Sequence, residues 1–158
     1  MALAAAAGTL HRNFQGYTTD PAEVLIGLGA SSIGSLPQGY VQNHADVPSW
    51  RDAVRRGELP VRRGIALSDA DRLRPAIINC LMCNLEADLE VLQRVHGGGA
   101  DLSISLARLE ELQREGLVEL HDDKVRVPEH ARPFVRIVAA AFDAYLDDGG
   151  QGRHSRAV

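Results

Sequence analysis

The stretch EGLVELHDDKVRV at residues 115–127 decides the fold of the second half of the chain. Gly116 is suited to ending a helix, because the position that follows a helix often needs a left-handed backbone. Residues 117–120 and 125–127 are rich in Val and Leu, and the polar residues 121–124 between them are typical of a turn. The stretch therefore predicts the end of a helix followed by a β-hairpin with a polar tip.

Helices are expected on both sides of this hairpin. Ser68 begins a Ser-x-x-Asp pattern that resembles a capping box, and an apolar periodic run follows it. Pro75 should kink or restart this helix, because proline removes a backbone hydrogen bond, and Pro133 should make the first turns of the last helix irregular. The expected helices span residues 68–83, 86–95, 103–115 and 129–146. Helices, a two-stranded wing and a closing helix make the second half winged-helix-like.

The first half of the chain has a different sequence pattern. Residues 1–7 are rich in Ala and predict the last turns of a helix, with Gly8 as its stop. Residues 24–35 form a glycine-interleaved apolar run, in which the absent side chains let a ligand or another segment come close. Beyond it the sequence predicts a loop at 36–46 and a short helix at 49–56.

Composition favours a mostly α-helical fold with some β structure, an α+β chain. Apolar residues make up 45% of the 158 residues but aromatic residues only 4%, so Ala, Leu, Val and Ile must fill the core. Turn formers between residues 58 and 67, such as Pro60 and Gly64, indicate the division between the halves. The predicted domains are residues 1–62 and 63–150, followed by a flexible tail at 151–158.

Charge and composition argue against several functional classes. A net charge of −4 counts against a sequence-independent nucleic-acid binder, because affinity for phosphate rests on clustered Lys and Arg. No apolar run reaches the roughly 18–20 residues that span a bilayer, and the start of the chain lacks the pattern of a signal peptide. With only two cysteines, no disulfide framework is implied. A cytoplasmic protein without nucleic-acid or membrane partners is expected.

Candidate chemical motifs are few. Cys80 and Cys83 form a C-x₂-C pair, but a zinc site needs two further ligands and an iron–sulfur cluster needs at least three thiolates. The pair is better interpreted as two thiols on the core face of a helix. The glycines of residues 27–34 do not form a dinucleotide fingerprint, because the third glycine is displaced. The six histidines show no ligand spacing, and no nucleophile elbow is present.

A series of short motifs is similar, in the same order, to those of one enzyme family. The first half contains HRNFQGYTT at 11–19, GLGASSI at 27–33 and YVQN at 40–43. The second half contains RGIALS at 63–68, LMC at 81–83, EGLV at 115–118 and AFDAYL at 141–146. On these residues the chain resembles the C-terminal portion of the oxygen-independent coproporphyrinogen III oxidases.

The resemblance implies a part of a larger enzyme of haem (porphyrin) biosynthesis. Members of this family are radical S-adenosylmethionine oxidoreductases that decarboxylate two propionates of coproporphyrinogen III to vinyl groups, giving protoporphyrinogen IX. Their [4Fe–4S] cluster is held by a Cys-x₃-Cys-x₂-Cys motif that is absent from this sequence. The chain would then comprise the end of the (β/α) barrel domain and the winged-helix-like C-terminal domain. Its partner would be the missing barrel portion of a monomeric enzyme, and alone it is expected to be inactive.

The same resemblance implies three cofactor-binding residues in this sequence, but no catalytic or metal-binding residue. Ile33 matches an isoleucine that lines the site of the second S-adenosylmethionine, and Phe14 and Gln15 match residues near that site. An apolar wall, an aromatic face and an amide suit an adenine or sulfonium group. Two alternatives stay open: Phe14 and Ile33 are simply core residues, or the chain is a non-catalytic winged-helix-like interaction module.

Overall fold

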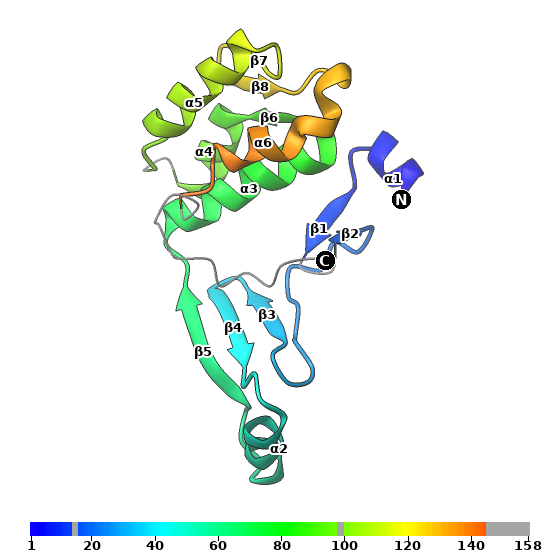
Figure 1. Ribbon diagram of the computed structural model, residues 1–158, viewed down its shortest axis with the longest axis vertical. Helices are drawn as coiled ribbons and strands as arrows, with labels where there is room; N and C mark the ends of the chain where they lie inside the picture. The colour runs from blue at the N-terminus through cyan, green and yellow to red at the C-terminus, as the bar shows by residue number, and fades with distance from the viewer. Residues whose placement is uncertain (14–15, 98–99, 145–158) are drawn as a thin grey trace. The chain divides into compact units, whose positions relative to one another are not determined.

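The structure is a computed structural model that describes residues 1–13, 16–97 and 100–144. The chain is mixed α/β and divides into two compact units, Met1–Ser68 and Asp69–Val158, which are described separately (Figure 1). The division expected at residues 62 and 63 stays a prediction. The expected tail at 151–158 lies outside the described residues.

The first unit is predominantly a β structure in its described residues. After α1 (Ala2–Ala6), the strands β1 (His11–Asn13) and β2 (Gly16–Thr18) pair antiparallel. The strands β3 (Ile33–Leu36), β4 (Gly39–Asn43) and β5 (Val61–Ala66) form an antiparallel sheet in the order β3–β4–β5. The helix α2 (Val47–Arg55) lies between β4 and β5 in the chain.

The β3–β4–β5 sheet corrects two predictions. Residues 36–46 were expected to form a loop, yet they contain β4 and the turn that joins it to β3. Residues 58–67 were expected to contain turn formers at the division between the halves, yet they contain β5. Each of these short strands contains a glycine, and β5 also contains two arginines, so local β propensity is weak. Cross-strand pairing rather than the local sequence therefore selects the extended form.

The helix α2 begins and ends with the local signals that its sequence contains. The Asp46 carboxylate accepts a hydrogen bond of 2.8 Å from the backbone N–H of Ser49 and caps the helix. Hydrogen bonds from the Ser49 side chain, the larger cause, and from the Ser49 backbone N–H lower the pKa of Asp46 below its ordinary value. Gly57 follows the helix with a φ of +72°, a conformation that glycine adopts without strain. The helix predicted at 49–56 is confirmed, with a start two residues earlier.

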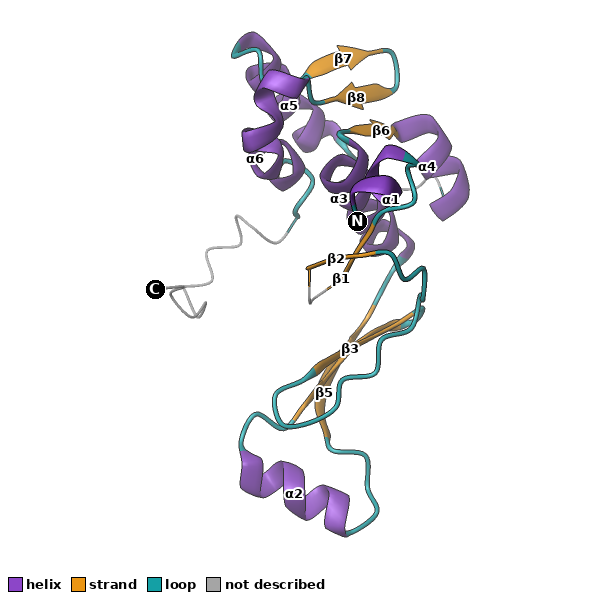
Figure 2. Ribbon diagram, turned by 90° about the vertical axis from the view of Figure 1, so that its right-hand side faces the viewer, coloured by secondary structure: helices purple, strands orange, loops and turns teal. Residues whose placement is uncertain are grey.

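The second unit combines helices with a three-stranded antiparallel sheet. Its elements in chain order are α3 (Asp69–Asn84), β6 (Glu86–Asp88), α4 (Leu89–His96), α5 (Ser103–Arg114), β7 (Glu119–His121), β8 (Lys124–Arg126), η1 (Glu129–Phe134) and α6 (Val135–Ala140). The order of the strands is β6–β8–β7. The hairpin β7–β8 lies beside α5 (Figure 2).

The stretch 115–127 folds as its sequence predicts. The helix α5 ends before Gly116, whose φ is +75°, and Asp122 takes a positive φ in the turn between β7 and β8. The last helix begins irregularly, as a 3₁₀ helix that contains Pro133. Residues 86–88 were expected to start a helix, but they form β6 against β8.

A continuous apolar core holds the second unit together. Leu73, Ile77 and Leu81 recur every four residues along α3, and each is fully buried. Pro75 lies inside α3 with an exposed side chain, and the helix continues through it instead of restarting there. The core that contains these α3 residues also includes Leu109, Val125, Val138 and Phe142.

One arginine ties together three segments of the second unit. The Arg74 guanidinium on α3 donates to the backbone carbonyl of Asp101 at 2.7 Å and to the hydroxyl of Ser105 at 3.2 Å. It also donates a longer hydrogen bond, of 3.4 Å, to the carbonyl of Phe142. Ser105 is 1% exposed, so its hydroxyl has little access to water. Arg74 therefore links α3 to the start of α5 and to the segment after α6.

Candidate functional site

One face of the β3–β4–β5 sheet gathers side chains from all three strands. Gln42 on β4 pairs with Ile33 on β3 and with Arg63 on β5. Directly paired residues of antiparallel strands project to the same face, so these three side chains form a row across the sheet. Tyr40 pairs with Ile65 in the next row of the same face. The strand register thus brings together residues that are far apart in the sequence, such as Ile33 and Ile65.

A pocket of about 490 Å³ lies on this sheet, within the first unit. Its lining is mostly apolar, and the apolar side chains are accessible, since Ile33 is 37% exposed and Ile65 is 52% exposed. Arg63 is the charged residue in the lining, and no carboxylate lines the pocket within the described part of the chain. The lining residues are Ile33, Tyr40, Val41, Gln42, Arg63, Gly64 and Ile65.

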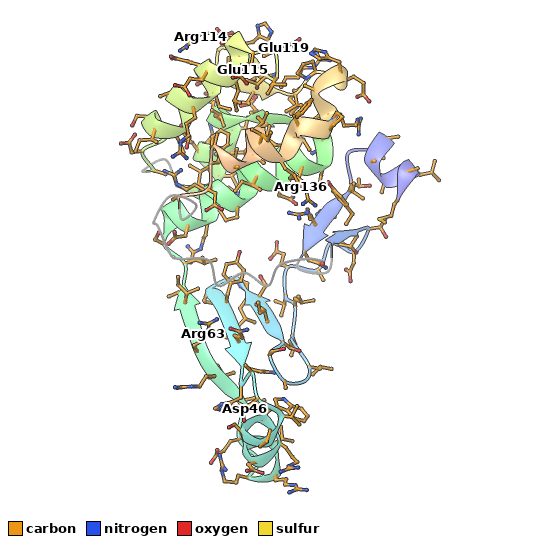
Figure 3. The ribbon with its side chains drawn as sticks, in the orientation of Figure 1. Asp46, Arg63, Arg114, Glu115, Glu119 and Arg136 are labelled. Carbon is orange, nitrogen blue, oxygen red and sulfur yellow. The ribbon has the colours of Figure 1, made fainter. Side chains whose placement is uncertain are left out.

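Two hydrogen bonds fix the polar side of the pocket. The Arg63 Nε donates to Gln42 Oε1 at 2.8 Å, and the Gln42 Nε2 donates to the carbonyl of Ser31 at 3.2 Å. Because the Gln42 amide nitrogen is directed to Ser31, its oxygen is directed to Arg63. Figure 3 shows Arg63 on β5, next to β4. The arrangement suits a ligand that has an apolar body and a negatively charged group.

The glycines of residues 27–34 make room for backbone rather than for the pocket. A Cβ on Gly27 would lie 2.9 Å from the carbonyl of Ile33, and one on Gly34 would lie 3.0 Å from the carbonyl of Leu25. The buried Asn43 side chain donates to the carbonyls of Gly27 and Gly29 at 3.1 and 2.9 Å. These contacts hold the loop that precedes β3 against β4, and so they position Ile33.

The three predicted cofactor residues have different outcomes. Ile33 lies in the lining of the pocket, whereas Phe14 and Gln15 lie outside the described residues. Their assignment to an S-adenosylmethionine site stays a prediction. The sequence alone does not indicate Gln42 or Arg63 as site residues. Their contact depends on the register of β4 against β5, and neither strand was predicted.

The cysteine pair lies in the second unit, on α3. Burial raises the pKa of the Cys80 thiol, so the thiolate that a metal needs is disfavoured. The Cys83 thiol donates a weak hydrogen bond to Asn79 Oδ1 at 3.6 Å. Within residues 1–13, 16–97 and 100–144, no three His, Cys, Asp or Glu side chains are grouped so that they could hold a metal ion. No helix in that part of the chain is both long and apolar enough to cross a membrane.

Comparison with known proteins shows which enzyme family the chain resembles. The HemN C-terminal domain family matches residues 67–134, which extend from the end of β5 through η1. The chain is also 48% identical, over all of its length, to the oxygen-independent coproporphyrinogen III oxidase of Bradyrhizobium diazoefficiens. The chain corresponds to the C-terminal portion of the oxygen-independent coproporphyrinogen III oxidases. The resemblance seen in the sequence motifs is thereby confirmed.

Further relatives define which portion of the family the chain matches. The oxygen-independent coproporphyrinogen III oxidase of Paracoccus denitrificans is 39% identical over the whole chain. A solved structure of the coproporphyrinogen III oxidase HemN from Escherichia coli, described as a radical SAM enzyme, superposes with a TM-score of 0.83 over 92% of the chain at 32% identity. The chain spans 34–35% of the length of these relatives and matches their C-terminal portion.

Proposed function

We propose that this chain forms part of an oxygen-independent coproporphyrinogen III oxidase of haem biosynthesis. The full enzyme would oxidatively decarboxylate coproporphyrinogen III to protoporphyrinogen IX. The observation that carries this proposal is the match over the entire chain to relatives that bear this name, including the strands that build the Ile33 pocket. The chain's own contribution would be one wall of the pocket for a second S-adenosylmethionine and the substrate, together with the C-terminal domain.

The residues of the pocket suit S-adenosylmethionine. Ile33 offers an apolar wall, and Tyr40 offers an aromatic ring that attracts a sulfonium. Phe14 and Gln15 are proposed as further contacts. When it is bound to such an enzyme, S-adenosylmethionine supplies radical chemistry. This chain's residues would bind and orient the cofactor and keep water from its apolar part.

An iron–sulfur cluster does not fit the residues of this chain. Only two cysteines are present, both on α3, and burial disfavours the thiolate of Cys80. The cluster of the full enzyme would be held by the missing barrel portion, which is the proposed partner of this chain. We therefore propose that the chain by itself has no turnover.

We also propose that the second unit is a winged-helix-like domain and that the first unit is the end of the barrel domain. The element order α3–β6–α4–α5–β7–β8 supports the first assignment, with β7–β8 as the wing and β6 as the third strand. The alternative of a separate interaction module is not favoured, because the similarity to the enzymes extends through the first unit as well.

The proposal is tested by a chimeric enzyme. This chain would replace the matching C-terminal portion of the Bradyrhizobium enzyme, and the chimera would be placed in a bacterial strain that lacks its own such oxidase. The chimera should restore anaerobic growth without added haem, whereas this chain alone should not. A chimera that accumulates as folded protein and does not restore growth would overturn the proposal.

A further inference from the structure

The pocket contains a guanidinium whose outer nitrogens are unoccupied. Neither Nη group of Arg63 has a hydrogen-bond or ion-pair partner in the part of the chain that the structure describes. Arginine cannot lose its charge under ordinary conditions, so a positive charge is permanently present at this position. No carboxylate lines the pocket among the described residues, so this charge has no negative partner there.

Gln42 holds this guanidinium in a defined orientation. Its Oε1 accepts from the Nε of Arg63 at 2.8 Å, and its own orientation is set by the hydrogen bond to Ser31. The contact therefore uses the Nε edge and leaves the two Nη groups for another acceptor. A side chain that is already restrained loses less conformational freedom when a ligand binds.

The strand register places Arg63 at the pocket and leaves its neighbour out. Gln42 pairs with Arg63 and Asn43 pairs with Val61, so the pairing skips Arg62 at a β-bulge. Bulges change the direction in which side chains project from a strand. Arg62 is exposed and does not line the pocket. Two adjacent arginines on one strand thus have different positions relative to the pocket.

The surroundings of Arg63 favour a carboxylate as the missing acceptor. A guanidinium matches a carboxylate through two parallel N–H···O hydrogen bonds, and apolar neighbours reduce the competition from water. Ile33, Tyr40 and Ile65 provide those neighbours and a surface for the body of a ligand. An apolar ligand without a carboxylate would leave the charge of Arg63 unpaired in the filled pocket.

We propose that Arg63 binds the carboxylate of a ligand whose apolar or planar body covers Ile33, Tyr40 and Ile65, and that Gln42 positions Arg63 for this contact. The choice of ligand rests on the proposed function, which supplies two sources of carboxylate. One is a propionate of the tetrapyrrole substrate, and the other is the amino-acid carboxylate of S-adenosylmethionine. The chemistry that Arg63 recognises is the same in both.

The test measures binding to the 158-residue chain, with one probe for each source. Coproporphyrin III, the stable oxidised form of the substrate, is compared with its tetramethyl ester, and S-adenosylmethionine is compared with its decarboxylated form. Dissociation constants are measured by fluorescence for the porphyrins and by NMR titration for the other pair. The variants are Arg63→Gln, Arg63→Lys and the matched control Arg62→Gln, each checked for wild-type far-UV circular dichroism.

For the ligand that uses the site, Arg63→Gln should raise the dissociation constant about tenfold, because a charge-assisted hydrogen-bonded contact is lost. Arg62→Gln should leave it within about twofold, since an exposed charge outside the pocket contributes little. Arg63→Lys should give an intermediate value, because lysine lacks the planar fork. The ester or decarboxylated partner should bind more weakly and be insensitive to all three changes.

The porphyrin and S-adenosylmethionine arms identify the source of the carboxylate. A wild-type chain that binds neither acid saturably, or folded Arg63→Gln and Arg62→Gln variants with equal affinities, would overturn the inference. The proposed function is judged separately, by growth of the chimera. A working chimera with an insensitive Arg63 rejects this inference alone, whereas Arg63-dependent binding with an inactive chimera rejects the proposed function alone.

Discussion

Replacement of Arg74 by methionine should destabilise the second unit substantially. The change keeps an apolar stem against α3 but removes the hydrogen bonds to the Asp101 carbonyl, at 2.7 Å, and to the Ser105 hydroxyl, at 3.2 Å. At about 1 kcal/mol for each of these two contacts, the loss is about 2 kcal/mol. The longer hydrogen bond to the Phe142 carbonyl, at 3.4 Å, adds little to this loss, because hydrogen bonds weaken with distance.

The Ser105 hydroxyl explains why the loss should not be recovered by water. Its residue is 1% exposed, so removal of the guanidinium leaves a buried polar group without its charged donor. For a unit of this size, a loss of about 2 kcal/mol lowers the melting temperature by roughly 10 °C. Thermal unfolding followed by far-UV circular dichroism measures this shift, because the helices of the second unit dominate the signal.

Arg136→Met is the matched control for this experiment. Arg136 is an exposed residue of α6 (Figure 3), and it has no hydrogen-bond or ion-pair partner in the described part of the chain. Its replacement should change the stability by no more than about 0.5 kcal/mol. Equal melting temperatures for the Arg74 and Arg136 variants would refute the reasoning that Arg74 bridges α3, α5 and the segment after α6.

Three further changes test other parts of the fold. Ile77→Ala should lower the free energy of unfolding by about 2–5 kcal/mol in urea titrations, because its fully buried side chain fills the core; a smaller loss would contradict that packing. Gly39→Ala should disrupt the β4–β5 pairing, since the added Cβ would lie 2.0 Å from the carbonyl of Ile65, and hydrogen exchange of β5 amides should accelerate. Hydrogen bonds from the Ser49 side chain and from its backbone N–H lower the pKa of Asp46 below its ordinary value. Their stabilisation of α2 is therefore fully present above the ordinary pKa of the carboxyl and is lost as the pH falls through the folded-state pKa. Asp46→Asn should flatten this acid dependence, and an unchanged acid profile would show that the cap contributes nothing.

Local signals in the sequence predict the elements whose causes are local. The Asp46 cap, Gly57 and Gly116 mark the ends of helices through their own backbone chemistry, so α2 and α5 were predictable. The hairpin β7–β8 combines apolar segments with a polar turn between them. Pro133 likewise accounts for the irregular start of the last helix. Each of these features depends on residues within one or two turns.

The sequence did not predict the strands that form only by pairing with segments distant in the chain. Residues 86–88 have no strong strand pattern, and β6 exists because β8 pairs with it from almost forty residues away. The strand β5 contains two arginines and a glycine, which do not favour a strand locally. Its pairing with β4 is also what brings Arg63 to Gln42. The candidate site was therefore only partly predictable: the family motifs indicated Ile33, but the polar half of the pocket follows from strand register.

The central claim is that this chain supplies the C-terminal portion of a coproporphyrinogen III oxidase, and the most direct test is turnover in vitro. The Bradyrhizobium chimera that carries this chain would be purified anaerobically, its cluster content would be measured, and it would be incubated with coproporphyrinogen III, S-adenosylmethionine and a reductant. We predict protoporphyrinogen IX as the product, and no product from this chain alone. A folded chimera with a full cluster content that forms no product, or turnover by the isolated chain, would contradict the account.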